Sequence, residues 1–243
     1  MKNDTILIFL DVLGFKSLFE QHGLDYIYNK YDNLIKNTLD AAWARKFVGN
    51  YAVVMLAESP VNITYFSDTV ILWLNDMNPL TLAATIDSLN ELLCKSIEEN
   101  FPLRGAISRG EAIMDKKNNI FLGKPLISAY MAEGALNLIG VTFSSDMGGK
   151  GLSLDPNMVL PYEKHYKLEK MELVKDGVID YPKHWRNTRK TDIKEHIIKM
   201  KDSQIYESPE LKSKCDKYYD NTIDFCNYSE SVHNELWEKK LKS

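Results

Sequence analysis

The apolar run ILIFL at residues 6–10 constrains the fold of this chain more than any other feature. Consecutive apolar residues without polar alternation are typical of a strand that is buried on both faces of a sheet. A single carboxylate, Asp11, ends the run, and Gly14 follows shortly after it. An aspartate at the end of a strand is often only the N-cap of the following helix. The sequence therefore predicts a central strand over residues 5–12 and leaves Asp11 with either a capping or a functional role.

Further strands and helices are expected around this strand. Apolar residues recur at helical spacing over residues 24–45 and 79–99, which indicates two packing helices. Runs of β-branched and aromatic residues flank Ser67 and Asp68, so we expect a tight hairpin with Asp68 at its tip. The other expected elements are a strand at 51–56, a strand at 103–115 broken by Gly105 and Gly110, a turn at 116–119, a helix over 123–136 with Pro125 in its first turn, and a strand at 139–144.

The chain changes character after the loop sequence MGGKG at residues 147–151. Residues 161–243 mix both signs of charge with scattered tyrosines and tryptophans, and we expect helices near residues 192–201 and toward the C-terminus. The sequence thus predicts an α+β domain over residues 1–145 and a mostly helical extension over residues 146–243 packed on its core. A solvated charged surface is the simplest role for this extension.

Composition excludes several classes of protein. The 243 residues are 44% hydrophobic and 26% charged, as in an ordinary globular protein, and the formal net charge of −4 argues against a general nucleic-acid coat. Three widely spaced cysteines, Cys94, Cys215 and Cys226, form no C-x-x-C pair, so we expect a reducing cytoplasm rather than disulfides or a zinc site. Asp11 interrupts the N-terminal apolar run before it reaches the length of a membrane span. We therefore expect a cytoplasmic protein with no membrane partner and no stable nucleic-acid partner.

The expected sheet makes Asp11 and Asp68 candidate neighbours. Two carboxylates at one sheet edge repel each other and call for a cation, and oxygen ligands suit Mg²⁺ or Mn²⁺. Two such ions can support an in-line displacement at phosphorus. The residues after Asp11 are Val12, Leu13, Gly14, Phe15 and Lys16. They open a helix whose backbone N–H groups and dipole suit a polyphosphate, and Lys16 adds charge. The pattern indicates phosphoryl or nucleotidyl transfer.

Three stretches of the chain together resemble a known family. FLDVLGF, YFSDTVILW and LRGAISRGEAIMDKKNNIFLGKPLISAYMAE are similar to the motifs of the class III nucleotidyl cyclase catalytic domain. They resemble more closely the pyrimidine cyclases of the bacterial Pycsar antiphage system. The resemblance covers about residues 5–145 and implies a ferredoxin-like αβ sandwich that works as a homodimer, with active sites at the subunit interface.

The resemblance also implies roles for individual residues. Asp11 and Asp68 would hold two Mn²⁺ or Mg²⁺ ions, with help from the carbonyl of Val12. In this family the metal activates the ribose 3′-hydroxyl, which attacks the α-phosphate and expels pyrophosphate. The implied product is a 3′,5′-cyclic nucleotide, which a separate effector protein reads in antiphage defence.

Two positions that depart from the family's pattern bear on which nucleotide base the protein would bind. Adenylate cyclases of this class place a lysine, and guanylate cyclases a glutamate, four residues before the hairpin aspartate, where this chain has Thr64. The acidic or small polar position on the other base-reading strand corresponds to Ile120. A purine is therefore not expected, and a pocket lined by Thr64, Tyr65 and Phe66 suits a pyrimidine, although strand alternation keeps all three from facing one pocket. UTP is the favoured substrate, with CTP close behind.

A second departure concerns the family's helical asparagine and arginine, whose places are taken here by Ile127 and Met131. Either the protein is a catalytically inert module that binds a nucleotide or a partner, or other cations do this work. We expect Arg109 to act in catalysis, with Arg104 and Lys124 as substrate ligands, because a bidentate arginine matches a phosphate well.

The alternative roles of these residues are structural. Arg109 could form a surface ion pair, and alternation along a regular strand would place Arg104 on the opposite face from Arg109. Tyr130 and Glu133 also match the family's AYxxE texture. The simpler interpretation of that pair is structural: the tyrosine ring packs against the core, and the glutamate is its neighbour on the helix.

Overall fold

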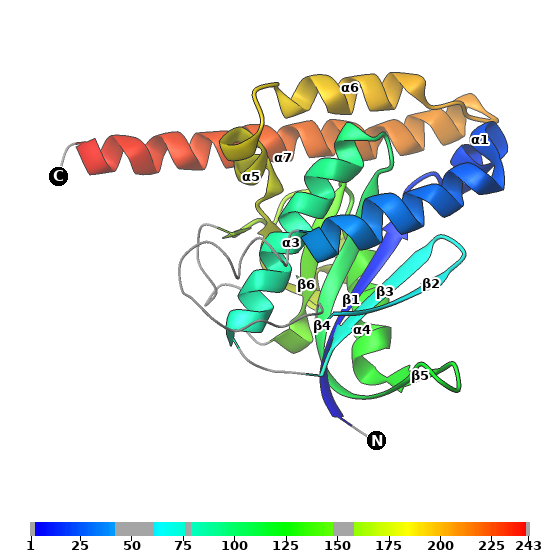
Figure 1. Cartoon of the computed structure of the whole chain (residues 1–243). Coiled ribbons are helices and arrows are strands. Elements are labelled where there is room, and N and C mark those ends of the chain that lie inside the picture. The colour runs from blue at the N-terminus through cyan, green and yellow to red at the C-terminus, as the bar shows by residue number, and fades with distance from the viewer. Residues whose placement is uncertain (1–2, 42–60, 76–78, 148–157, 242–243) are drawn as a thin grey trace.

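The computed structural model describes residues 3–41, 61–75, 79–147 and 158–241, in which one mixed sheet is flanked by helices (Figure 1). The strands are β1 (Asn3–Val12), β2 (Asn62–Phe66), β3 (Thr69–Leu74), β4 (Leu103–Asp115), β5 (Ile120–Gly123), β6 (Gly140–Ser144), β7 (Val159–Leu160) and β8 (Val174–Ile179). The helices are α1 (Phe15–Asn29), η1 (Lys30–Lys36), α3 (Pro79–Glu98), α4 (Lys124–Glu133), η2 (Ser145–Met147), η3 (Leu168–Leu173), α5 (Tyr181–Thr188), α6 (Ile193–Ser203) and α7 (Pro209–Leu241). The chain is an α+β protein, as the sequence predicts.

The sheet has the strand order β2-β3-β1-β4-β6-β8-β7, and β5 pairs with β4 outside this path. The apolar strand β1 lies inside the sheet and runs antiparallel to both of its neighbours, β3 and β4. The one parallel pair along this order is β4 with β6. The register sets Asp11 opposite Thr69 on one side and opposite Arg104 on the other. The acidic end of β1 is therefore enclosed by the hairpin and by the start of β4.

The two faces of β1 pack against different partners. Ile6, Ile8 and Leu10 are fully buried in the larger core, to which α3 contributes. Leu7 and Phe9 point to the other face and pack with Ala129 of α4. Because side chains alternate along a strand, Asp11 continues the second set and emerges on the face of α4.

The predicted hairpin and the predicted helix at 79–99 are confirmed, the latter as α3. The helix expected at 24–45 begins earlier, at Phe15, and is irregular. Gly23 has φ +79°, and a π-helical segment follows over Lys30–Lys36. Residues 37–41 are helical, whereas the rest of that prediction and the strand expected at 51–56 lie outside the described residues.

The predicted break in the strand at 103–115 is wrong, since β4 is continuous through both glycines. A Cβ at Gly105 would lie 2.2 Å from the carbonyl oxygen of Phe9, so glycine allows β1 and β4 to approach closely. A Cβ at Gly110 would meet the ring of Pro125 at 3.3 Å. These glycines serve close packing rather than a bend.

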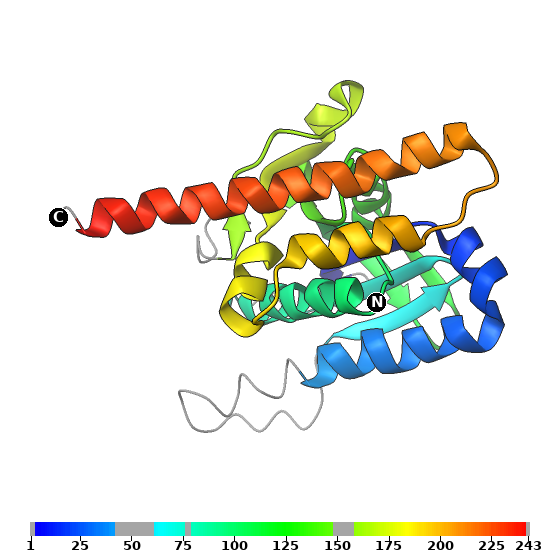
Figure 2. The same cartoon turned by 90° about the horizontal axis from the view of Figure 1, so that it is seen from above.

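The C-terminal part does more than add helices. The helix expected near 192–201 is α6, and a long helix, α7, follows it. The two unpredicted strands β7 and β8 extend the same sheet, because β8 pairs with β6 and with β7. Figure 2 shows α6 and α7 lying side by side, and α7 contributes Tyr219, Phe225 and Cys226 to the larger core. Within the described residues, no helix has the length and apolar character needed to cross a membrane.

Candidate functional site

The structure brings Asp11 and Asp68 to the same end of the sheet. Asp68 follows Ser67 in the β2–β3 turn, where Ser67 adopts φ +55°. The backbone N–H of Val12 donates to the Asp68 carbonyl oxygen at 3.0 Å, which ties the hairpin tip to the end of β1. The side chain of Asp11 is 24% exposed, so this acidic edge is partly accessible to a ligand.

Arg104 and Glu133 complete this acidic edge. Arg104 Nη2 lies 3.7 Å from Asp11 Oδ2 and forms an ion pair with Glu133, the last residue of α4. Only 11% of the Arg104 side chain and 5% of the Glu133 side chain are exposed. One buried cation therefore faces two carboxylates, with Asp68 adding a third negative charge nearby.

The excess of negative charge alters the protonation of the cluster. The pKa of Asp11 is raised to about 6, mainly by burial and then by the negative charge of Glu133, while Arg104 opposes the shift. The charge of Asp68 also raises this pKa. Burial likewise raises the pKa of Glu133, against the opposing charge of Arg104. The cluster is thus electrostatically suited to receive a further cation.

Tyr31 holds the hairpin tip in place from the irregular helix. Its hydroxyl donates to the Ser67 carbonyl oxygen at 2.5 Å, and its ring stacks on Tyr65 with 5.1 Å between centroids. Burial and then the charges of Asp68 and Asp11 raise the pKa of Tyr31, so its hydroxyl stays protonated and remains a donor. Tyr31 therefore fixes the backbone that carries Asp68.

The turn after Asp11 is less open than the sequence suggests. Gly14 has φ +75° and precedes α1, so it makes the tight turn expected of it. The N–H groups of Val12 and Leu13 are already committed to the carbonyl oxygens of Asp68 and Pro102, and the Leu13 side chain is buried. The backbone of residues 14–16 is thus better placed than that of residues 12–13 to meet a phosphate.

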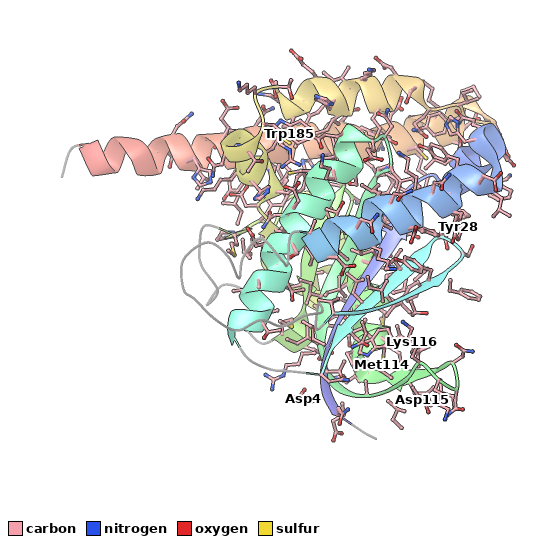
Figure 3. The ribbon with its side chains drawn as sticks, viewed as in Figure 1. Asp4, Tyr28, Met114, Asp115, Lys116 and Trp185 are labelled. Atoms are coloured by element: carbon pink, nitrogen blue, oxygen red, sulfur yellow. The ribbon has the colours of Figure 1, made fainter. Side chains whose placement is uncertain are left out.

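Two of the predicted cations lie away from the acidic edge. Arg109 is five residues from Arg104, about 17 Å along β4, and pairs with Asp4 at 2.6 Å near the start of β1 (Figure 3). Lys124, at the first turn of α4, pairs with Asp146 at 3.0 Å and stands about 13 Å along the helix from Glu133. Within one chain neither reaches Asp11, and the cation beside Asp11 is Arg104 rather than the expected Arg109.

Lys16 and Phe15 begin α1 beside the acidic edge. Lys16 is exposed and pairs with Glu207, which precedes α7, and with Glu20 at 3.8 Å. The ring of Phe15 packs partly against the larger core and stacks on Phe19. Lys16 thus lies in a solvent-exposed ion pair, whereas the Phe15 ring is taken up by packing.

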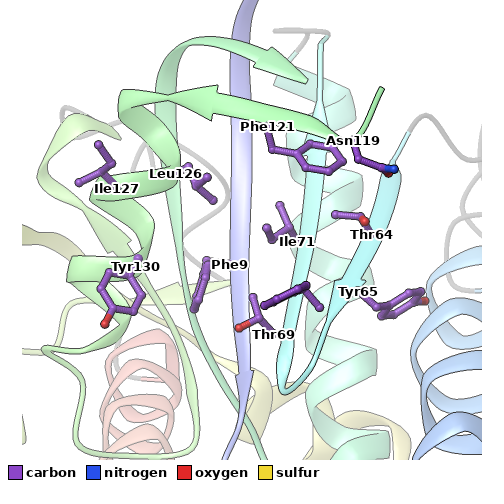
Figure 4. Close-up of a pocket in the computed structure, with 11 residues that line it drawn as sticks. Phe9, Thr64, Tyr65, Thr69, Ile71, Asn119, Phe121, Leu126, Ile127 and Tyr130 are labelled. Carbon is purple, nitrogen blue, oxygen red and sulfur yellow. The ribbon is translucent and has the colours of Figure 1, made fainter. Parts of the chain in front are cut away.

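A pocket of about 710 Å³ opens on the α4 face of the sheet next to these carboxylates (Figure 4). Its lining residues are Phe9, Thr64, Tyr65, Phe66, Thr69, Ile71, Asn119, Phe121, Leu126, Ile127 and Tyr130. Phe9 lies two residues before Asp11 on the same face of β1, and Thr69 is the partner of Asp11 in the ladder. The pocket lining therefore comes close to the acidic edge, although Asp11, Asp68 and Arg104 are not part of it.

All three expected base-contact residues line this pocket, so the expectation that strand alternation would keep one of them out is wrong. Thr64 and Phe66 share one face of β2, while the ring of Tyr65 turns toward Tyr31 and its hydroxyl donates to the Tyr31 carbonyl oxygen at 3.3 Å. Ile120 does not line the pocket; its neighbour Asn119 does, beside Thr64 in Figure 4. Thr64 and Asn119 thus place two neighbouring polar side chains in the lining of an otherwise largely apolar pocket.

Ile127 and Met131 are both strongly exposed on α4, and Ile127 lines the pocket. No hydrogen-bonding group therefore stands at the two helix positions where the family has its asparagine and arginine. Tyr130 packs edge-on against Phe9 and lines the same pocket.

Glu133, Tyr31 and Asn119 are absent from the sites predicted from sequence. The signal for Glu133 was its place in the AYxxE texture, which a packing helix explains equally well. Tyr31 lies in a π-helical segment and Asn119 in a turn between strands. Both reach the site only through the tertiary fold, which no local sequence pattern predicts.

Among the described residues, no group of three or more histidine, cysteine, aspartate or glutamate side chains is arranged to hold a metal ion.

The chain was compared with protein families and with characterised proteins. No protein-family model matches the chain, and no characterised protein matches its sequence significantly.

Proposed function

We propose that this protein is a pyrimidine nucleotide cyclase, which converts UTP, or alternatively CTP, to the 3′,5′-cyclic mononucleotide and pyrophosphate. One observation carries the proposal: Asp11, Asp68 and Arg104 lie close together next to a pocket of about 710 Å³. The pocket suits a base and ribose, and the charged edge suits a triphosphate.

Asp11 and Asp68 are chemically suited to Mn²⁺ or Mg²⁺, because both are oxygen donors and Asp11 carries an unfavourable negative charge. The carbonyl of Val12 is a third candidate ligand. A bound divalent ion would supply Lewis-acid activation of the ribose 3′-hydroxyl and would offset charge that develops on the phosphate. The pair of carboxylates supports this fit, and the remaining ligands would come from the substrate's phosphates or water.

In the proposed reaction the ribose 3′-hydroxyl loses its proton to solvent water and its oxygen attacks the α-phosphorus. The bond from the α-phosphorus to the oxygen that it shares with the β-phosphate breaks, and pyrophosphate leaves with that electron pair. Arg104 is the positive side chain beside Asp11, and its Nε donor has no acceptor among the described residues. A guanidinium in this place can bind a phosphate oxygen and stabilise developing charge. Lys16, which is exposed at the start of α1, can add a second contact.

The pocket supports the preference for a pyrimidine. Aromatic side chains of Phe9, Phe66 and Phe121 offer stacking surfaces. Thr64 and the Asn119 amide can each make a hydrogen bond to a base edge. One hydroxyl and one amide match the single Watson–Crick edge of uracil or cytosine, and an amide can orient either oxygen or nitrogen toward the base.

We further propose that the active protein is a homodimer. Large apolar side chains are exposed around the pocket, on the hairpin, β5 and α4: Phe66, Ile120, Leu122, Ile127, Tyr130 and Met131. Exposed apolar patches of this kind mark interaction surfaces. A second copy that covers this face would close the pocket and supply groups that replace the missing asparagine and arginine. The cyclic nucleotide would then act on a separate effector in antiphage defence, a role that rests on the resemblance alone.

The second candidate is a module that binds a nucleotide without turning it over. Ile127 and Met131, which cannot hold a ribose or a phosphate by hydrogen bonds, favour it. The costly cluster of Asp11, Asp68 and Glu133 disfavours it, because an inert module gains nothing from the cluster's unfavourable charge.

The experiment that tests the proposal incubates the purified protein with each of the four ribonucleoside triphosphates and Mn²⁺, and identifies products by mass. Asp68→Asn is the test variant, and Asp202→Asn, at an exposed position on α6, is the matched control. A cyclic mononucleotide from UTP or CTP, made by the wild type and the control but not by Asp68→Asn, supports the proposal. A preference for ATP or GTP would overturn the pocket argument, and no product from any triphosphate would favour the inert module.

A further inference from the structure

Arg104 is held not only by Asp11 and Glu133 but also by the C-terminal helix α7. Its guanidinium carbon lies 5.0 Å from the centre of the Tyr218 ring. A guanidinium over an aromatic face is attracted by the ring's quadrupole, and the attraction is stronger where water is excluded. With 11% of its side chain exposed, Arg104 is in such a place.

The same face of α7 also secures the chain segment that follows Glu133. Asn221 Nδ2 donates to the Asn137 carbonyl oxygen at 2.7 Å, and Thr222 Oγ1 accepts from the Ile139 N–H at 2.9 Å. Tyr218, Asn221 and Thr222 are three and four residues apart, which places them on one side of the helix. Arg104 Nη1 in turn donates to the Leu136 carbonyl oxygen, in this segment, at 3.3 Å. Two paths thus connect α7 to Arg104.

Without these contacts Arg104 would have a choice of positions. Its guanidinium already pairs with Glu133, and a rotation that gave further donors to Asp11 or Glu133 would leave fewer of them for a phosphate. The ring of Tyr218 gives the guanidinium a flat surface on the remaining side, and the Leu136 carbonyl takes one donor. This arrangement leaves the Nε donor of Arg104 without an acceptor among the described residues.

We propose that Tyr218 is a positioning residue for Arg104, so that the C-terminal helix helps set the affinity of the candidate site for a triphosphate. The proposal rests on the proposed function. It assigns a role to a residue outside the region that resembles cyclases. The aromatic ring carries most of the effect, and the Tyr218 hydroxyl, which also interacts with the guanidinium, carries the rest.

The test compares Tyr218→Phe, which keeps the ring, with Tyr218→Leu, which keeps apolar bulk but lacks the π face. Tyr228→Leu is the matched control: Tyr228 lies on the same helix, and its hydroxyl donates to the Pro161 carbonyl oxygen, away from Arg104. Two quantities are measured for each variant: the KM and kcat for UTP with Mn²⁺, and the Kd for inorganic tripolyphosphate with Mn²⁺ by calorimetry.

For Tyr218→Leu we expect the KM and the Kd to rise about 30-fold, since a desolvated cation–π contact is worth about that factor. Tyr218→Phe should show a smaller rise, because it keeps the ring and loses only the hydroxyl that also interacts with Arg104. Tyr228→Leu should match the wild type. In an Arg104→Ala background, Tyr218→Leu should have no further effect, because the contact is already absent.

The outcomes separate the two proposals. A wild type that cyclises UTP, with Tyr218→Leu unchanged in KM and Kd, would overturn the role of Tyr218 alone. An equal loss in Tyr228→Leu would do the same, because it would indicate a general packing effect, and an equal loss in Tyr218→Phe would overturn the role of the ring. A wild type that binds tripolyphosphate without turnover would overturn the cyclase, while the Kd values would still decide the role of Tyr218. A wild type that neither binds nor reacts would overturn both.

Discussion

Asp11 and Arg104 face each other across the β1–β4 ladder, and Arg104 Nη2 lies 3.7 Å from Asp11 Oδ2. The pair places a cation and a candidate metal ligand side by side next to the pocket. Its surroundings are acidic, since Glu133 pairs with the same arginine and Asp68 lies at the adjacent hairpin tip. Most of what we expect of this protein follows from this imbalance of charge.

Asp11→Asn should stabilise the metal-free protein while it abolishes activity. The pKa of Asp11 is raised from 3.8 to about 6, so folding favours its protonated form. The stability from that proton is fully present below the ordinary pKa of the carboxyl and is lost as the pH rises through about 6. Near neutral pH the ionised carboxylate should therefore cost about 2 to 3 kcal/mol, which the amide avoids.

Urea denaturation across this pH range checks that expectation. The gain in the free energy of unfolding should shrink as the pH falls toward about 4, where both proteins carry a neutral side chain. Mn²⁺ should raise the melting temperature of the wild type but not that of Asp11→Asn. An Asp11→Asn protein that is less stable than the wild type near neutral pH would contradict the electrostatic account.

Arg104→Met should destabilise the fold by about 3 to 5 kcal/mol, because it leaves the buried Glu133 carboxylate without its partner. Arg104→Met combined with Glu133→Met should recover most of that loss and still lack activity. Chemical denaturation of the two variants measures the difference. A double variant no more stable than Arg104→Met would show that Glu133 is not the source of the cost.

Thr64→Val should raise the KM for UTP by roughly 2- to 10-fold with little effect on kcat, because it removes one hydrogen bond to the base at constant shape. Thr188→Val is the control, since Thr188 donates to the His184 carbonyl oxygen on α5. Steady-state kinetics with UTP decide the matter. Identical KM values for Thr64→Val and the wild type would remove Thr64 from the base contacts.

Leu122→Asp should convert the dimer to monomers and reduce activity about 100-fold or more, since it buries a charge at an apolar interface. Leu122 is 59% exposed on β5, beside the pocket. Ile198→Asp on α6, at a side chain 47% exposed, is the matched control and should stay dimeric and active. Analytical ultracentrifugation measures the mass of each. A monomeric, active wild type would refute the homodimer.

The sequence predicts well what local patterns encode. The β-branched runs around Ser67 and Asp68 predict the hairpin, and the apolar spacing over 79–99 predicts α3. The strands β7 and β8 escape prediction because β7 has two residues and β8, VKDGVI, is interrupted by charges and a glycine. Their place in the sheet depends on pairing with β6, a long-range contact.

The arginines show the same limit within the site. Alternation correctly separates Arg104 from Arg109 onto opposite faces, but it does not say which face carries Asp11. That follows from the register of β1 against β4, which sets Asp11 opposite Arg104 and Ile6 opposite Arg109. Tyr218 reaches Arg104 from a helix more than a hundred residues further along the chain, and no pattern in the sequence indicates that contact.

The most direct measurement of the central claim compares UTP with its 3′-deoxy analogue, in the presence of Mn²⁺, by mass analysis of the products. If the ribose 3′-hydroxyl is the nucleophile, UTP yields cyclic UMP and pyrophosphate in equal amounts, and the analogue yields neither although it competes with UTP for the site. Release of pyrophosphate or phosphate from the 3′-deoxy analogue would show that water is the nucleophile, and the protein would then be a hydrolase rather than a cyclase.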